Sequence, residues 1–121
     1  MAKRAKKKLV GKTRTTDTRP WTPAQATSRI RNYANDLGFD LWWTDHAKDQ
    51  LAERGLIIGD ALHVLKNGFV YNKPEPATQE NHFRYAMECS TPNSGSRTVR
   101  VIVIPSPQRT EAKIVTVMWA D

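Results

Sequence analysis

The chain has 121 residues and a formal net charge of +7, which is enough length for one folded domain and an appendage. No apolar run reaches the roughly 18 residues that a membrane-spanning helix needs, and the N-terminus lacks the apolar segment of a secretory signal, so we expect a cytoplasmic protein with no membrane partner. The single cysteine, Cys89, excludes an internal disulfide and a cysteine-rich zinc site.

The excess positive charge lies in the first 20 residues, which contain eight basic residues and one acidic residue, whereas residues 21–121 contain 11 of each. Residues 1–20 have too few apolar side chains to form a core, which predicts a flexible basic arm before a single domain over residues 21–121. The arm would attract RNA or ribosomes by counterion release, or it would only add solubility. The arm residues expected to bind nucleic acid are Lys3, Arg4, Lys6, Lys7, Lys8, Lys12 and Arg14.

The segment after the arm begins with a complete set of helix start signals. Thr22 can act as the N-cap, Pro23 occupies the first helical position, and Gln25 completes a capping box. Apolar residues then recur at helical spacing until a glycine, which predicts an amphipathic helix over residues 23–37.

Residues 39–43 are aromatic and lie between two helical patterns, which predicts a short extended segment. Trp42 and Trp43 should therefore point in opposite directions. One of them can enter the core, and the other either packs elsewhere or stacks a nucleic-acid base.

Residues 44–68 predict two short helices, over about residues 45–54 and 60–66, separated by Gly55. In the first helix, His46, Gln50 and Arg54 recur every four residues and should share a polar face. A histidine and an arginine on one helix face suit phosphate chemistry, because histidine side chains titrate near neutral pH and arginine binds phosphate in a bidentate way. The alternative is an ordinary solvated helix face.

The remaining chain changes to the alternating pattern of β-strands, with predicted strands at residues 69–73, 81–90, 97–104 and 113–119. Helices followed by neighbouring strands define an α+β fold. We predict an N-terminal helix, two short helices, and then a curved four- to five-stranded antiparallel sheet.

Polar residues interrupt these strands. His82 and Arg84 share one face, while Arg100 and Thr116 stand within otherwise apolar strands. A polar group in a central strand must be hydrogen-bonded or must point into a cleft. For Arg100 the alternatives are an RNA contact, an exposed sheet face or an ion pair with Glu88. For Thr116 they are a site role or simple β-propensity.

Other chemistries have little support in the sequence. His46, His63 and His82 lack the spacing of metal ligands, and the chain contains no glycine-rich phosphate loop and no signature of a serine or cysteine nucleophile. We therefore predict neither a metal nor a cofactor.

Several of these stretches together resemble a known group of proteins. They are DHAKDQLAERGLIIGDALHVLKNG, a strand with Arg84 and Tyr85, an apolar strand with Arg100, and the closing IVTVMW. Over about residues 39–119 the chain resembles a small domain-of-unknown-function family of the RelE/BrnT-like (barnase-EndoU-colicin-RelE) toxin superfamily.

The resemblance implies a RelE-like fold and a metal-independent endoribonuclease, in which the ribose 2′-hydroxyl attacks the adjacent phosphate. By position, it implies His46 as the acid or base, Arg54 and Arg84 as the phosphate clamp, and Tyr85 or Thr116 as an auxiliary donor. His82 is a substitute base outside the shared pattern.

A toxin of this kind would have RNA or the ribosome as its target and an antitoxin protein as a partner. The competing hypothesis is a non-catalytic module that binds RNA, ribosomes or, in a phage, another protein through the basic arm. The long arm, the helix predicted at residues 23–37 and the neutral core differ from the toxin pattern and favour this alternative.

Overall fold

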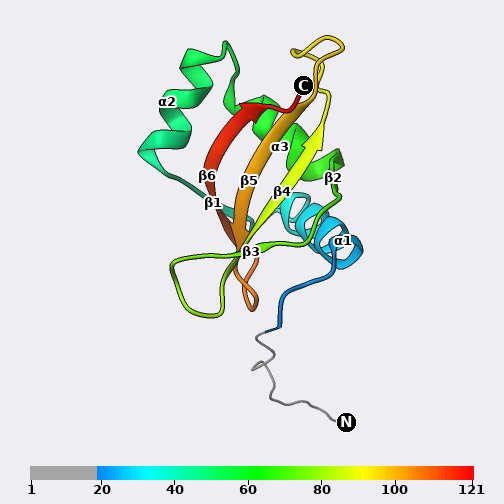
Figure 1. Cartoon of the computed structure of the whole chain (residues 1–121), viewed down its shortest axis with the longest axis vertical. Helices are drawn as coiled ribbons and strands as arrows, with labels where there is room; N and C mark the ends of the chain where they lie inside the picture. The colour runs from blue at the N-terminus through cyan, green and yellow to red at the C-terminus, as the bar shows by residue number, and fades with distance from the viewer. Residues whose placement is uncertain (1–18) are drawn as a thin grey trace.

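The structure is a computed structural model that describes residues 19–121 (Figure 1). The arm residues from Lys3 to Arg14 that were predicted to bind nucleic acid lie outside the described residues. The elements in chain order are α1 (Pro23–Ala34), β1 (Asp40–Trp43), α2 (Asp45–Glu53), α3 (Ile58–Asn67), β2 (Phe69–Val70), β3 (Glu75–Pro76), β4 (Phe83–Cys89), β5 (Val99–Pro105) and β6 (Glu111–Trp119).

The predicted α+β class is confirmed. The strands form an open sheet in the order β1-β6-β5-β4-β2, and β3 pairs with β4. Strands β4, β5 and β6 are antiparallel, as predicted, but β1 runs parallel to β6. The sequence did not indicate this parallel pair, because local periodicity does not show that the first strand pairs with the last.

The helices leave one face of the sheet open. Figure 1 shows α1 and α3 behind the sheet and α2 beside β6. Helix α2 lies on the opposite side of the molecule from α1 and β2. Every second residue of β5 is buried on the side of the helices, and Val99, Val101 and Val103 are completely buried. Burying a valine side chain of this kind stabilises the fold by about 1.5 to 3 kcal/mol relative to exposure.

The first helix is shorter than predicted. It ends at Ala34 instead of residue 37, and the side chain of Leu37 is fully exposed. Asn35 ends the helix because its side-chain amide donates to the Arg31 carbonyl oxygen, while the Asp36 carboxylate accepts from the Gly38 backbone. Such local side-chain bonds compete with the helical backbone pattern.

Two other boundaries differ from the prediction. Helix α3 begins at Ile58, before the predicted residue 60, because the Asp60 carboxylate reaches back to the backbone N–H of Ile57 at 2.9 Å. Strand β2 ends at Val70, and β3 falls in a segment predicted as a connection. In residues 19–121, no helix has both the length and the apolar character needed to cross a membrane.

Candidate functional site

The predicted polar face of α2 is not a single solvent-facing surface. Gln50 is only 7% exposed, and its side-chain oxygen accepts a hydrogen bond of 2.8 Å from the backbone N–H of Val117. The prediction that Gln50 lies beside His46 and Arg54 on one polar face is therefore wrong. The physical reason is that β6 continues beyond the end of β1, so that the buried N–H of Val117 needs another acceptor.

The structure also places His46 and Arg54 at opposite ends of α2. His46 lies exposed in the first turn, and Arg54 caps the last turn and pairs with the Glu53 carboxylate at 3.2 Å. Eight residues of helix correspond to a rise of about 12 Å. The structure therefore does not bring the predicted acid or base, His46, together with Arg54 of the predicted phosphate clamp.

Tyr85 lies on the helix-covered face of β4, whereas its neighbour Arg84 points to the other face. The Tyr85 hydroxyl accepts a hydrogen bond of 2.8 Å from the Trp21 backbone N–H, and the two rings stack. Burial raises the pKa of Tyr85, although the Trp21 hydrogen bond and the charge of Arg29 act in the opposite direction. The structure thus separates Tyr85 from Arg84.

Arg100 and Thr116 lie on the open face, which we define as the side of the sheet turned away from α1 and α3. The Arg100 guanidinium donates to the Glu88 carboxylate at 2.7 Å, so the ion pair considered from the sequence is present. Thr116 of β6 pairs with Ile102 of β5, two residues along β5 from Arg100. These two candidates share a face with Arg84 but not with Tyr85.

Two adjoining hollows of ≈ 100 Å³ and ≈ 160 Å³ lie on the open face and have Gln79, Ile104 and Lys113 in common, so we treat them as one feature, the front groove. The chain that passes through β3 crosses the front of the sheet in Figure 1 and supplies one wall. The other lining residues are Trp42, Ala77, Thr78, His82, Arg84, Ser106, Glu111, Ala112 and Val115.

A backbone contact orients the His82 ring in this groove. Its Nδ1 atom lies 3.0 Å from the backbone carbonyl oxygen of Glu80. A carbonyl oxygen can only accept, so Nδ1 carries the proton and the neutral ring keeps a free lone pair on Nε2. His82 follows Asn81, whose backbone has a left-handed φ of 65°, and this turn leads the histidine into β4.

Two cations and an aromatic ring accompany His82. Lys113 is exposed and lines both hollows, and Arg84 lines the second, where its guanidinium donates to the Pro76 carbonyl oxygen at 3.3 Å. Trp42 is 62% exposed and is the register partner of Lys113 on the adjacent strand. The groove therefore combines a histidine, two cations, the Glu111 carboxylate and a flat apolar surface, and the Glu75 carboxylate lies 4.0 Å from Arg84.

His82, Arg84 and Trp42 were candidates from the sequence, whereas Lys113 was not. The signal for Lys113 is its pairing with Ile104 in β5, and this register depends on an irregularity between Ile102 and Val103. A bulge of this kind shifts the alternation of faces, so the sequence alone does not show which face Lys113 occupies.

A larger hollow of ≈ 470 Å³ lies at the start of α1, between Arg19, Trp21 and Arg29. Its lining contains arginine, proline, threonine, glutamine and tryptophan but no carboxylate, histidine, lysine or cysteine. Such a lining can attract an anion but offers no group that exchanges protons near neutral pH. Of this hollow and the front groove, only the front groove is lined by a histidine.

The described part of the chain contains no group of three or more histidine, cysteine, aspartate or glutamate side chains that could hold a metal ion. Cys89, the single thiol, is partly buried, and burial raises its pKa while the charge of Arg31 acts to lower it. This thiol is not among the residues that line the front groove.

The fold and the groove define the class of this protein, which is an α+β domain with a polar groove on the open face of its sheet. Residues 43–119 match the family described as "Domain of unknown function (DUF4258)", and the chain belongs to this family. The match contains His82, Arg84 and Lys113 and leaves out α1. No curated protein and no solved structure matches the chain.

Proposed function

We propose that this protein is a toxin-type endoribonuclease that cleaves RNA in the front groove by acid–base chemistry. The observation that carries the proposal is the 3.0 Å hydrogen bond between His82 Nδ1 and the Glu80 carbonyl oxygen, because it leaves Nε2 ready to accept a proton. The resemblance of the sequence to RelE/BrnT-like toxins supports the same reaction class.

In the proposed reaction, His82 Nε2 removes the proton of a ribose 2′-hydroxyl, and the 2′-oxygen attacks the adjacent phosphorus. The bond from phosphorus to the 5′-oxygen then breaks, giving a 2′,3′-cyclic phosphate and a free 5′-hydroxyl. Lys113 donates the proton that the 5′-oxygen needs, and together with Arg84 it stabilises the added negative charge on the phosphate. Trp42 stacks a neighbouring base and so holds the strand in the groove.

This proposal changes the roles that the resemblance implied. His82 takes the place of His46 as the base, and Arg84 keeps its place in the phosphate clamp. Arg100 and Thr116 lie farther along the same open face, where they can contact RNA that extends beyond the groove. Arg54 pairs with Glu53, and Tyr85 supports the fold through Trp21.

We also propose a cellular location and a protein partner for this enzyme. An enzyme that cleaves cellular RNA would act in the cytoplasm, alone or on the ribosome. An antitoxin protein would restrain it by covering the front groove.

The proposal is tested by incubating the full-length protein with labelled RNA in EDTA, beside the variants His82→Gln and His46→Gln. We expect His82→Gln to lower the cleavage rate by about a hundredfold or more, because general acid–base catalysis contributes about 10² to 10⁴ in rate. His46→Gln is the matched control and should cleave like the parent. Circular dichroism checks that both variants are folded.

Two further observations identify the reaction. The product should carry a 2′,3′-cyclic phosphate, and a substrate with a single 2′-deoxyribose at the cleaved position should remain intact. Loss of activity in His46→Gln but not in His82→Gln would move the site to α2. Absence of cleavage by the parent, with naked RNA and with ribosomes, would overturn the proposal in favour of the binding module.

A further inference from the structure

The neutral domain has a strongly uneven distribution of charge. Residues 36–53, which include β1 and α2, contain five acidic residues and one basic residue. Residues 23–34 and 66–73 contain four basic residues and no acidic residue. Figure 1 shows these two parts on opposite sides of the molecule, with α2 on the left and α1 and β2 on the right. One side of the domain is therefore positive even though the whole domain is neutral.

A stack of planar groups lies on the positive side. The Arg31 guanidinium is 4.4 Å from the centre of the Phe69 ring, and the Phe69 and Tyr71 rings stack at 6.1 Å with an angle of 27°. Arg31 is fixed by hydrogen bonds of 2.9 Å and 2.8 Å to the carbonyl oxygens of Gly68 and Asn67. The stack is therefore built onto the backbone at the end of α3.

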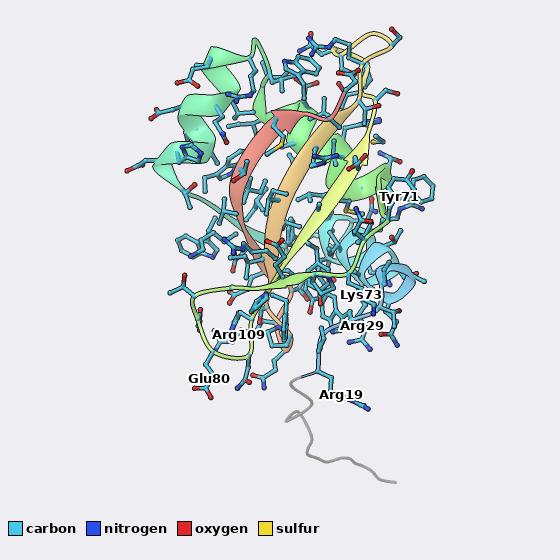
Figure 2. All side chains as sticks on the ribbon, viewed as in Figure 1. Arg19, Arg29, Tyr71, Lys73, Glu80 and Arg109 are labelled. Atoms are coloured by element: carbon cyan, nitrogen blue, oxygen red, sulfur yellow. The ribbon has the colours of Figure 1, made fainter. Side chains whose placement is uncertain are left out.

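The outer end of this stack faces solvent. Phe69 is 47% exposed and Tyr71 is 64% exposed, which is unusual for two adjacent aromatic rings with apolar faces. Figure 2 shows Tyr71, Lys73 and Arg29 following one another along the same side of the molecule. We call this surface the basic flank; it consists of Arg29, Arg31, Lys66, Phe69, Tyr71 and Lys73. None of these residues lines the front groove.

We infer that the basic flank binds single-stranded nucleic acid, with one base stacked on Tyr71 and the neighbouring phosphates near Lys66, Lys73 and Arg29. Proteins that bind single strands combine aromatic rings, on which bases stack, with cations that follow the phosphates. Residues 23–34 and 66–73 contain no carboxylate, and Glu88, the register partner of Phe69, is paired with Arg100 at 2.7 Å. A polyanion would therefore meet little unpaired negative charge at this surface. An acidic protein segment would also be attracted by the cations, but it would not require an exposed stack of rings.

This inference does not depend on RNA cleavage. The probe is a fluorescent oligodeoxythymidylate of about 12 nucleotides, which fits the usual site size of single-strand binding surfaces. Because the probe lacks the 2′-hydroxyl, the reaction proposed for the front groove cannot cleave it. A loss of binding to this probe is therefore distinguishable from a loss of RNA cleavage.

The first comparison removes the ring at the end of the stack. Tyr71→Ala should weaken binding about fivefold or more, because stacking on an aromatic side chain is worth at least that factor per base. Tyr71→Phe keeps the ring and should bind like the parent. A duplex of the same length does not expose its bases for stacking, so its affinity should change little in Tyr71→Ala.

The second comparison concerns charge. Lys73→Gln should reduce the slope of log affinity against log salt concentration by about 0.7, the value expected for one lost phosphate contact on a single strand. Arg109→Gln is the matched control, since it removes the same charge from an exposed residue that Figure 2 shows on another part of the molecule. Its salt slope should equal that of the parent.

Ultraviolet crosslinking locates the bound strand directly, and we expect an adduct on the peptide that contains Tyr71. Parent-like affinity in Tyr71→Ala and Lys73→Gln, with adducts confined to residues 1–20, would overturn the inference in favour of the arm. It would also be overturned if the two variants lost binding to a polyglutamate peptide but not to the oligonucleotide. The basic flank would then be a protein-binding surface.

Discussion

The side-chain oxygen of Gln50 accepts a hydrogen bond of 2.8 Å from the backbone N–H of Val117, and this contact joins α2 to the outer edge of β6. Strand β1 covers β6 only from Glu111 to Ile114. Beyond that point, the glutamine of α2 provides the acceptor that a neighbouring strand would otherwise provide. Helix α2 therefore continues the edge protection that β1 begins.

Replacing Gln50 with leucine tests this role. Gln50→Leu keeps a buried side chain of similar size but leaves the Val117 N–H without an acceptor. We expect the free energy of unfolding to fall by about 1 to 3 kcal/mol. Urea denaturation followed by circular dichroism measures the change. The control is Lys48→Ala, an exposed substitution in the same helix that should change stability by less than about 0.5 kcal/mol. Equal stability of the two variants would contradict the prediction.

Features that depend on neighbouring residues were predictable from the sequence. The capping box at α1 is present, since the Gln25 backbone donates to Thr22 Oγ1 and the Gln25 side chain accepts from the Thr22 backbone. The alternation of β4 correctly separates the buried Tyr85 from the exposed Arg84. In both cases the signal lies within a few residues of the chain.

Features that depend on pairing between distant segments were not predictable in this way. Helical spacing placed Gln50 on a polar face, but an unpaired N–H of β6 draws its side chain inward. The front groove has the same origin: Lys113 joins Trp42 and Ile104 through the register of three strands. A sequence pattern gives the period of each strand but not the register between strands.

Tyr85 provides a second prediction, because its hydroxyl accepts a hydrogen bond from the buried backbone N–H of Trp21. Tyr85→Phe removes this acceptor and should lower the free energy of unfolding by about 1 to 3 kcal/mol. The rate of RNA cleavage per folded molecule should not change, since the hydroxyl lies on the covered face. The exposed substitution Tyr71→Phe should leave stability unchanged. A large loss of cleavage with normal stability in Tyr85→Phe would give this tyrosine a role in the reaction.

Asp60 predicts a specific dependence of stability on pH. Burial tends to raise the pKa of this carboxyl group, but hydrogen bonds from Thr91, the Ile57 backbone and Asn93 outweigh burial and hold the pKa below its ordinary value of 3.8. A lowered pKa in the folded state means that the carboxylate stabilises the protein at pH values above 3.8. This contribution is lost as the pH falls through the pKa of the folded state.

The Asp60→Asn variant tests this linkage. Its amide places a donor where the carboxylate accepts, so at pH 7 the free energy of unfolding should fall by about 1 to 3 kcal/mol. The difference from the parent should become smaller as urea titrations are repeated at pH values below 3.8. Asp49→Asn, an exposed change in α2, should have nearly the same free energy of unfolding as the parent at pH 7. A difference between Asp60→Asn and the parent that stays constant with pH would contradict the assigned linkage.

Two glycines of the α3 region should respond to alanine with opposite signs. A Cβ atom at Gly68 would lie 2.6 Å from the Val64 carbonyl oxygen and 3.0 Å from the Glu88 carbonyl oxygen. Both contacts are with backbone, so α3 and β4 would have to move apart. Overpacking of this kind costs about 1 to 3 kcal/mol. Gly68→Ala should therefore lower the midpoint of urea denaturation.

Gly59 lies within α3, and the nearest atom to a Cβ added there is a methyl group of Ile57 at 3.6 Å, an ordinary contact distance. Alanine has the higher helix propensity, so Gly59→Ala should raise the free energy of unfolding by about 0.5 to 1 kcal/mol. Both variants can be compared in one series of urea titrations with the parent. A rise in the free energy of unfolding for Gly68→Ala would contradict the close approach of α3 to β4 at this position, and a fall for Gly59→Ala would contradict the gain in helix propensity.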